Sequence, residues 1–368
     1  MNKYYQDHEV FLGEKSYKIF FGKNILENSN SIFKDYVFSK KIIVIYDSSL
    51  EHNHLPRLMN SLNNFNVNLI KVKNGEKSKS FDSLKLLLNQ ILSLGVTRET
   101  ILIAFGGGVI GDLVGFAASV LLRGLKYIQI PSTLLAQVDS SVGGKTGINT
   151  KHGKNLVGSF YQPLFVLSDF NLLNTLNNRE LLAGYAEIVK YGLIIDSDFF
   201  NWLDKNWQNI IKKNETHRAE AIIKSCKIKS KIVEEDEFEN GKRAILNLGH
   251  TFAHAFEALS KYNGSLLHGE AVALGMVQAF KLSWSLGLCK YSEFIKVKTH
   301  IENIGLPSTI DSLPIRINSS KKLWQVMQND KKNKNGNVNF ILPKSIGKVV
   351  IFDEVNYKDL DIIFEENK

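Results

Sequence analysis

A cluster of glycines directly after an apolar run constrains this chain more than any other stretch. Thr100–Phe105 is short and apolar, as buried parallel strands are, and Gly-Gly-Gly-Val-Ile-Gly-Asp follows it at 106–112. Glycines at this point let the backbone turn sharply from strand to helix and leave amide groups available to phosphate oxygens. The stretch therefore predicts an anion-binding turn between a strand and a helix.

The rest of the first half alternates strand and helix patterns. Lys41–Tyr46, Val67–Val72 and Tyr127–Ile130 have the composition of short strands, and Gly111–Leu121 has that of a helix. Before them, Glu9–Gly22 contains two β-rich runs around a Gly-Glu-Lys turn, which indicates a hairpin at a sheet edge. The alternation predicts an α/β domain with a mostly parallel, Rossmann-like sheet over residues 1–172.

The second half is different in character and predicts a mainly α-helical domain over residues 173–368. Its helical patterns cover Asn178–Lys190, Ala219–Val233, Ala244–Leu259, His268–Leu286 and Tyr291–Ile304. Near the end, two short β-rich runs at 338–342 and 349–352 indicate a small hairpin. A chain of 368 residues is long enough for two such domains.

Composition excludes several classes of protein. The net charge is +9, but the lysines are scattered and are not interleaved with aromatic residues, so we expect an anionic small-molecule substrate and no nucleic acid. Cys226 and Cys289 have no metal-ligand spacing and are expected to be ordinary core residues. The N-terminus lacks an apolar signal segment, and the apolar run Leu113–Leu122 is too short to span a bilayer. We therefore expect a cytoplasmic protein with no membrane partner.

The glycine turn alone is a weak nucleotide signal. Gly106, Gly108 and Gly111 satisfy G-x-G-x-x-G, but a standard dinucleotide fold places an acid about 20 residues further on. No acid stands at 126–132; Asp47, at the carboxyl end of an earlier strand, is the acid available for a ribose. A nucleotide site here would be built from its parts in a different order.

The helical half contains a second group of polar residues. Glu187 and Lys190 share one helix face, and His250 and His254 share another at a spacing of four. No Glu follows His250, so this is not a metalloprotease helix. His268 is a further candidate ligand. Two histidines and one glutamate make a good Zn²⁺ site with positions left open for substrate oxygens. Spacing alone leaves both a metal site and ordinary helical histidines open.

Taken together, the motifs resemble those of the 3-dehydroquinate synthases, the sugar phosphate cyclases of the shikimate pathway. The motifs are Gly-Glu-Lys-Ser-Lys-Ser (75–80), Gly-Gly-Gly-Val-Ile-Gly-Asp (106–112), Asp-Ser-Ser-Val-Gly-Gly-Lys-Thr-Gly (139–147), Lys-Asn-Leu-Val-Gly (154–158), Gly-Tyr-Ala-Glu-Ile-Val-Lys-Tyr-Gly (184–192), Arg-Ala-Ile-Leu-Asn-Leu-Gly-His-Thr-Phe (243–252), Leu-His-Gly-Glu-Ala-Val (267–272) and Asp-Lys-Lys (330–332). They occur in this order along nearly the whole chain.

The resemblance implies a dehydroquinate synthase-like fold, a homodimer, and an enzyme with NAD and one Zn²⁺ or Co²⁺ ion. It implies a phosphate-eliminating lyase that converts 3-deoxy-D-arabino-heptulosonate 7-phosphate into 3-dehydroquinate and phosphate. The implied steps are transient oxidation, elimination of phosphate, re-reduction, ring opening and intramolecular aldol closure.

The resemblance also implies roles for individual residues. The implied metal ligands are Glu187, His250 and His268. The residues implied to surround NAD are Asp47, Glu76, Lys79, Gly107, Gly108, Asp112, Ser132, Thr133, Lys145 and Lys154. The phosphate would meet Arg123 of a partner subunit, Lys145, Asn247 and Lys331. The carboxylate would meet Lys229 and Arg243. The hydroxyls and the proton relay would involve Asp139, Asn155, Lys190 and His254.

Other functions remain open at this point. Related cyclases act on sedoheptulose 7-phosphate or glucose 6-phosphate, but those substrates lack a carboxylate, so Lys229 and Arg243 favour the dehydroquinate reaction. Metal-dependent polyol dehydrogenases share the architecture and a triple-glycine turn, and would lack the run at 139–145. A catalytically inactive binding protein would tolerate the loss of ligands, and none is missing. The chain departs from the family in having Leu121-Leu122, without an aromatic residue, before Arg123.

Overall fold

The computed structural model describes residues 6–39, 41–212, 214–261, 264–317, 319–328 and 338–365. By its internal contacts the chain divides into two compact units, residues 1–176 with 218–238, and residues 177–217 with 239–368. The sequence predicts one division after residue 172. The difference arises from helix α7 (Glu215–Glu235), because its residues from 218 onward belong to the first unit.

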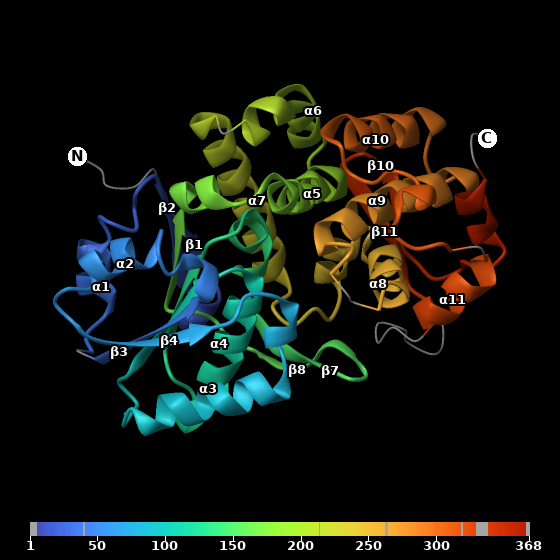
Figure 1. The fold of residues 1–368 in the computed structure, drawn as a ribbon. Coiled ribbons are helices and arrows are strands. Elements are labelled where there is room, and N and C mark those ends of the chain that lie inside the picture. The colour runs from blue at the N-terminus through green and yellow to red at the C-terminus, as the bar shows by residue number, and fades with distance from the viewer. Residues whose placement is uncertain are drawn as a thin grey trace. The chain divides into compact units, whose positions relative to one another are not determined.

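The first unit is built on a seven-stranded sheet (Figure 1). In sheet order the strands are β1 (Gln6–Val10), β2 (Tyr17–Gly22), β9 (Phe165–Asp169), β6 (Tyr127–Pro131), β5 (Ile101–Gly106), β3 (Lys41–Asp47) and β4 (Asn66–Val72). β1 pairs with β2 antiparallel, as the expected hairpin, and the other pairs are parallel. The mostly parallel α/β sheet expected from the alternating patterns is confirmed, with β9 as a strand that the sequence reading did not identify.

Both faces of this sheet are covered, which explains why its central strands are apolar throughout. Along β3, Ile42 and Val44 face one apolar cluster, and Ile43 and Ile45 face the other. The first cluster includes residues of α1 (Asn30–Tyr36) and α2 (Leu55–Ser61), and the second includes residues of α3 (Phe81–Ser93) and α4 (Gly108–Val120). The period-two alternation of each strand thus divides its side chains between two helical layers.

The strand order places the glycine turn beside Asp47. β3 lies between β4 and β5, so consecutive strands leave β3 toward opposite sides. Asp47 ends β3, and Gly106 ends its neighbour β5. A Cβ on Gly106 would come within 3.3 Å of the Asp47 Cβ. Open α/β sheets bind ligands at the carboxyl ends of strands where the order reverses, and these two residues stand at that point.

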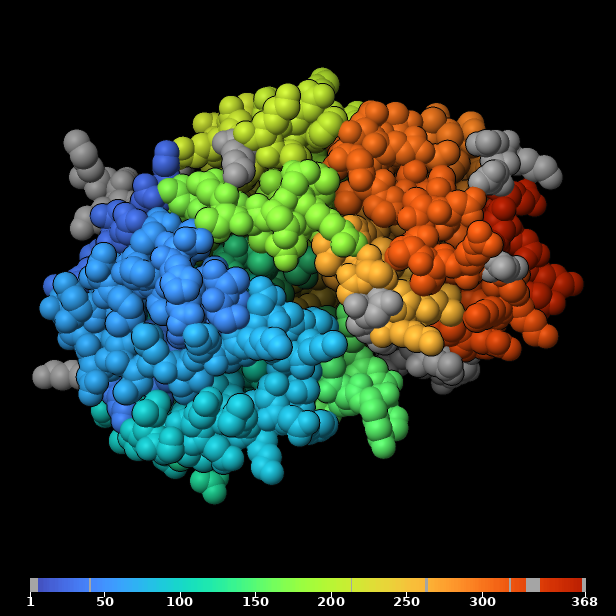
Figure 2. Space-filling view, viewed as in Figure 1, coloured from blue at the N-terminus to red at the C-terminus, as the bar shows by residue number. Residues whose placement is uncertain are grey.

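A long hairpin carries the motifs between residues 145 and 160. β7 (Lys145–Thr150) and β8 (Gly153–Phe160) pair antiparallel, and in Figure 2 the green hairpin tip projects from the surface as a finger. Gly147 and Gly158 face each other across the pair so closely that a Cβ on either would collide with the opposite backbone. The sequence reading assigned no strands here, because glycine in a run lowers its strand propensity.

The second unit is mainly α-helical, as expected, and its central element is α9. Its helices are α5 (Asn178–Ile195), α6 (Ser197–Ile211), α8 (His250–Leu259), α9 (His268–Ser285), α10 (Tyr291–Ile304) and α11 (Ser320–Gln328). α9 packs against α5, α8 and α10. The expected terminal hairpin is confirmed as β10 (Phe340–Ser345) with β11 (Lys348–Phe352). The sequence reading did not identify α6 and α11.

The single helix expected over 244–259 is wrong in its first part. Lys242–Asn247 forms a 3₁₀ helix, the chain turns at Leu248 and Gly249, and α8 begins at His250. Gly249 has φ of +79°, a left-handed conformation that glycine adopts without a steric penalty. Apolar periodicity continues across the break, so periodicity alone could not reveal it.

The two cysteines are both free thiols. Cys226 lies on α7 in the core of the first unit, and burial raises the pKa of its thiol to about 12. Burial also raises the pKa of Cys289. Cys226 is thus a core residue as expected, whereas Cys289 is only partly buried. None of the helices in the described part of the chain combines the length and apolar character that crossing a bilayer requires.

Candidate active site

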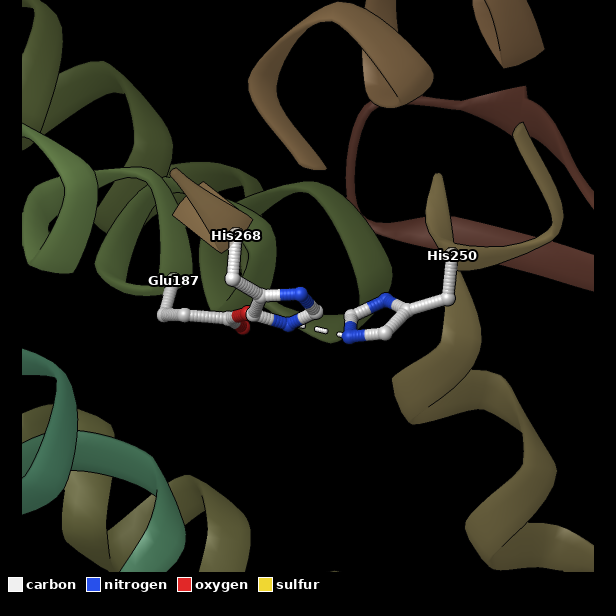
Figure 3. A group of neighbouring side chains, drawn as sticks. All are labelled: Glu187, His250 and His268. Carbon is white, nitrogen blue, oxygen red and sulfur yellow. Dashed lines mark ion pairs between the residues drawn. The ribbon is translucent and has the colours of Figure 1, made fainter. Parts of the chain in front are cut away.

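Three helices of the second unit bring Glu187, His250 and His268 together (Figure 3). Glu187 lies in the middle of α5, and the two histidines are the first residues of α8 and α9. One ligand atom from each residue falls within 4.8 Å of the other two. These are the three residues that the family resemblance implies as metal ligands.

The two carboxylate oxygens of Glu187 face different partners. Oε2 is 2.5 Å from the Lys190 ammonium, one helical turn along α5. Oε1 is 3.7 Å from Nε2 of His250 and 3.6 Å from Nε2 of His268. Glu187 is fully buried, and Oε1 has no hydrogen-bond partner in the described part of the chain. A buried carboxylate is stable only with charge or hydrogen-bond compensation, so Oε1 is suited to a further cation.

In both histidines, Nδ1, the ring nitrogen on the side away from Glu187, contacts an oxygen atom. Nδ1 of His250 is 3.2 Å from the carbonyl oxygen of Leu248, and Nδ1 of His268 is 3.3 Å from Oε2 of Glu257. A carbonyl or carboxylate oxygen can only accept, so each of these contacts is a hydrogen bond when the neutral ring carries its proton on Nδ1. In that tautomer both Nε2 atoms present a lone pair on the side of Glu187.

This donor set fits a divalent metal ion. Bonds of about 2.0–2.1 Å at tetrahedral angles put neighbouring ligand atoms roughly 3.4 Å apart, and the observed separations from Oε1 are 3.6 and 3.7 Å. Two imidazole nitrogens and one carboxylate oxygen leave a coordination position for a substrate oxygen, as catalytic zinc sites do. The arrangement can thus hold a Lewis acid beside a buried lysine.

The other predicted residues of the second unit lie on the same or adjacent elements. His254 follows His250 by one turn on α8, with ring centroids 5.7 Å apart, and its centroid is 6.4 Å from that of His268. Arg243 is buried in the 3₁₀ helix that precedes α8. Asn247 donates to Glu239 Oε1 over 2.8 Å. Lys331 lies outside the described residues.

In the first unit the glycine turn is lined by the predicted hydroxyl residues. A Cβ on Gly107 would lie 3.1 Å from Thr133 Cγ2, so that side chain packs directly against the turn. Ser132 is buried, and its backbone amide donates to the Gly106 carbonyl over 2.9 Å. Asp47 Oδ1 accepts from the backbone amide and hydroxyl of Ser49, so it also caps the short helix after β3.

A polar network joins four more predicted residues. Lys79 Nζ donates to Asp112 and to Asn155 Oδ1. Asn149 connects the network. Its side-chain nitrogen Nδ2 donates to Glu76 Oε1 over 2.7 Å, and its Oδ1 accepts from the backbone amide of Asn155 over 3.0 Å. Burial raises the pKa of the Asp112 carboxyl, an effect that the Lys79 ammonium opposes. Asn149 was not among the predicted site residues; its place between the motifs at 139–147 and 154–158 was the available signal.

Asp139 and Lys229 form an ion pair within the first unit. Lys229 Nζ is 2.8 Å from Asp139 Oδ1 and donates to the Asp139 carbonyl over 2.6 Å. Asp139 lies in a π-helical turn, Ala136–Ser140, a rare conformation that is frequent at functional sites. These two predicted site residues, which are 90 positions apart in the sequence, are thus in direct contact.

The remaining predicted residues of the first unit are more accessible. Lys145 is exposed at the start of β7, and Lys154 is partly exposed on β8. Arg123 is exposed in a turn after α4 where Leu122 and Arg123 both have positive φ, +48° and +66°. Such values are strained for residues other than glycine and are often found at functional sites.

Comparison with known proteins gives the family. Residues 69–183 match the family model described as 3-dehydroquinate synthase N-terminal, and residues 184–333 match 3-dehydroquinate synthase C-terminal. A 3-dehydroquinate synthase of Rhodospirillum rubrum is 46% identical over 94% of this chain and 91% of its own length. The chain belongs to the 3-dehydroquinate synthase family. Another relative, the 3-dehydroquinate synthase of Bartonella tribocorum, is 44% identical over 98% of this chain and 97% of its own length.

Solved structures agree with membership of the 3-dehydroquinate synthase family. A 2-deoxy-scyllo-inosose synthase complexed with carbaglucose-6-phosphate, NAD⁺ and Co²⁺ is 26% identical, with a TM-score of 0.85 over 98% of this chain and 100% of that one. The 2-epi-5-epi-valiolone synthase of Streptomyces hygroscopicus subsp. jinggangensis, with NAD⁺ and Zn²⁺ bound, is 25% identical, with a TM-score of 0.86 over 96% and 97%. A glycerol dehydrogenase of Schizosaccharomyces pombe, 18% identical with a TM-score of 0.65 over 93% and 86%, shares the fold. The fold class and the family expected from the sequence are confirmed.

Proposed function

We propose that this chain converts 3-deoxy-D-arabino-heptulosonate 7-phosphate into 3-dehydroquinate and phosphate. The observation that carries the proposal is the match of nearly its whole length to 3-dehydroquinate synthases at 43–46% identity. The reaction is a phosphate-eliminating lyase reaction in which the substrate is transiently oxidised, loses phosphate, is reduced again and closes by an intramolecular aldol step.

The metal centre is proposed at Glu187, His250 and His268, with Zn²⁺ or Co²⁺ as the ion. Its support is the cluster around the buried Glu187, whose Oε1 lies within 3.7 Å of the Nε2 atoms of both histidines. When bound, the metal supplies a Lewis acid for the substrate alcohol, and NAD supplies the hydride acceptor. Lys190, whose ammonium is 2.5 Å from Glu187, is proposed to exchange a proton with that alcohol as part of a relay with His254.

NAD is proposed to bind the first unit at the carboxyl ends of β3 and β5. The glycine turn would present backbone amides to the pyrophosphate at the N-terminus of α4, where the helix dipole favours an anion. The proposed NAD residues are Asp47, Glu76, Lys79, Gly107, Gly108, Asp112, Ser132, Thr133, Lys145 and Lys154. The hydrogen bonds of Lys79 to Asp112 and Asn155 support this set, because they hold the polar side chains in place before any ligand binds.

The substrate carboxylate is proposed to bind Lys229 and Arg243. Lys229 already pairs with a carboxylate, that of Asp139, so the environment of its ammonium accepts such a group. The phosphate is proposed to meet Arg123, Lys145, Asn247 and Lys331. Asp139 and Asn155 would then contact the hydroxyls. Several cations around one dianion both bind the substrate and fix its orientation.

We further propose a cytoplasmic homodimer in which Arg123 of one subunit reaches the phosphate bound to the other. The exposed, left-handed turn at Leu122 and Arg123 supports a role outside the unit's own core. Neither nucleic acid nor a membrane is proposed as a partner.

Phosphate release from 3-deoxy-D-arabino-heptulosonate 7-phosphate, with NAD⁺ and Zn²⁺ added, tests the proposed reaction. Formation of 3-dehydroquinate, identified by mass and NMR, with no net NADH is the expected result. Turnover of sedoheptulose 7-phosphate or glucose 6-phosphate in its place would refute the substrate assignment, and Lys229 with Arg243 would be the first roles to withdraw. Net NADH formation would refute the closed redox cycle.

A further inference from the structure

Helix α8 contributes more to the candidate metal centre than one ligand. His250, His254 and Glu257 follow one another at spacings of four and three, so they lie on one face of the helix. Glu257 is the one acidic residue of α8, and it is 3% exposed although the rest of the helix is mainly apolar. A carboxylate in this position costs stability unless it has a partner, and His268 is one.

The ring of His268 lies between two buried carboxylates. Its Nε2 is 3.6 Å from Glu187 Oε1, and its Nδ1 is 3.3 Å from Glu257 Oε2. The two contacts use opposite sides of the imidazole, so a proton on Nδ1 faces Glu257 and leaves the Nε2 lone pair directed toward Glu187. His250 has the same arrangement, with the Leu248 carbonyl in the place of Glu257. A carbonyl of the backbone is fixed by the chain, whereas the anchor of His268 is a side chain and can be replaced.

We propose that Glu257 is a positioning residue for the metal centre. By accepting the Nδ1 proton of His268, it keeps the ring in the tautomer whose Nε2 lone pair points to the metal, and it raises the basicity of that nitrogen. The inference rests on the proposed metal centre of Glu187, His250 and His268. It adds that α8 holds two of the three ligands, His250 directly and His268 through Glu257.

Metal affinity of substituted full-length protein tests this role. Glu257→Gln keeps the shape and an acceptor oxygen but removes the charge, and Glu257→Leu removes the acceptor. We expect Zn²⁺ affinity, measured by competition with a chromophoric chelator, to fall about 10-fold in the first variant and toward 100-fold in the second. Glu302→Gln is the matched control: Glu302, on α10, accepts from the Ser308 hydroxyl, and its replacement should leave Zn²⁺ affinity unchanged.

Two further measurements separate positioning from a general structural effect. The visible spectrum of the Co²⁺-loaded protein reports ligand geometry, and we expect it to change in Glu257→Gln but not in Glu302→Gln. In the metal-free wild-type protein, ¹⁵N NMR of the histidine rings should show the proton of His268 on Nδ1. This second measurement needs no variant and remains decisive if the Glu257 variants do not fold.

The outcomes are distinguishable. Wild-type Zn²⁺ affinity with an unchanged Co²⁺ spectrum in both Glu257 variants, or a proton on Nε2 of His268 in the wild-type protein, would overturn the role of Glu257 alone. Failure of the wild-type protein to bind Zn²⁺ or Co²⁺ would overturn the proposed metal centre and this inference with it. Turnover of the expected substrate by the wild-type protein is measured separately and tests the proposed function.

Discussion

At the scale of single residues, the chemistry of the second unit depends on how Glu187 is partnered. Its Oε2 is paired with Lys190, and its Oε1 faces two imidazole nitrogens. The carboxylate and the lysine side chain are each at most 2% exposed. Because the two charges compensate each other in a buried site, removing either leaves the other uncompensated, a loss that typically costs about 3–5 kcal/mol. Glu187, a proposed metal ligand, therefore also contributes to the stability of α5 through its pairing with Lys190.

This dual role predicts different results for two ligand substitutions. His268→Ala should lose metal and turnover while the protein stays folded and binds NAD⁺, because its proposed NAD residues belong to the first unit. Glu187→Gln should lose metal and turnover too, with an additional loss of stability from the buried Lys190. Dialysis with metal analysis, calorimetric NAD⁺ binding and urea unfolding measure the three properties.

The exposed His152, in the turn of the β7–β8 hairpin, provides the control, and His152→Ala should keep full metal content. Full metal content and a wild-type rate in either His268→Ala or Glu187→Gln would contradict the ligand assignment.

At the scale of elements, the Glu187–His250–His268 cluster depends on how closely three helices approach one another. A Cβ on Gly269 would collide with the backbone carbonyl of Ala183 on α5, and one on Gly275 would collide with the carbonyl of Gly249 before α8. Glycine on α9 thus allows backbone-to-backbone contact on two sides. His250 and His268 begin α8 and α9, so the spacing of these helices fixes the distance between the two ligands.

Substitution of Gly275 should therefore affect the site without touching a ligand. In Gly275→Ala the added methyl group has no room, so α8 must move away from α9. We expect a loss of about 1–3 kcal/mol in unfolding free energy together with weaker Zn²⁺ binding. Urea unfolding and chelator competition on the same sample measure both.

Gly241→Ala is the matched control, because no atom lies within 4 Å of the added Cβ and its φ is −163°. Wild-type stability and metal affinity in Gly275→Ala would show that the helix contact does not set the ligand spacing.

At the scale of the whole molecule, each unit contains its own set of candidate functional residues. The first contains the glycine turn, the Lys79–Asp112–Asn155 network and the Asp139–Lys229 pair, and the second contains the Glu187–His250–His268 cluster. The proposed homodimer would add Arg123 from a partner. Sites that need two subunits can be tested by mixing inactive variants.

We predict that Arg123→Ala and Glu187→Gln proteins, each nearly inactive alone, recover activity when unfolded together and refolded as a mixture. Random pairing makes half of the dimers mixed, and each mixed dimer has one complete site if Arg123 acts across the interface. Activity should then reach about a quarter of that of wild-type protein treated in the same way.

No recovery, with mixed dimers demonstrated by differently tagged chains, would show that Arg123 acts within its own subunit. A mixture of Lys190→Ala and Glu187→Gln is the control, since both residues belong to one cluster and no site becomes complete.

Local patterns in the sequence were sufficient to predict many of the secondary-structure elements and the family of this protein. The run Thr100–Phe105 with its glycines predicted β5 and the turn into α4, and the apolar spacing at 291–304 predicted α10 to the residue. The motifs gave the family, and with it the three cluster residues. Strand and helix periodicities are local properties, because they reflect which side chains of one element face an apolar environment.

The tertiary structure decided the features that depend on contacts between elements distant in the sequence. Apolar periodicity did not predict three features of the fold: the break at Gly249, the β7–β8 hairpin, and the membership of α7 in the first unit. Periodicity shows that a face of an element is apolar, but it does not show which other element covers that face or where two backbones come into contact. The same holds for the site. Sequence spacing predicted that His250 and His254 share one helix face. The contacts of His268 with Glu187 and with Glu257 form only because α5, α8 and α9 pack together, with glycines of α9 at the points of closest approach.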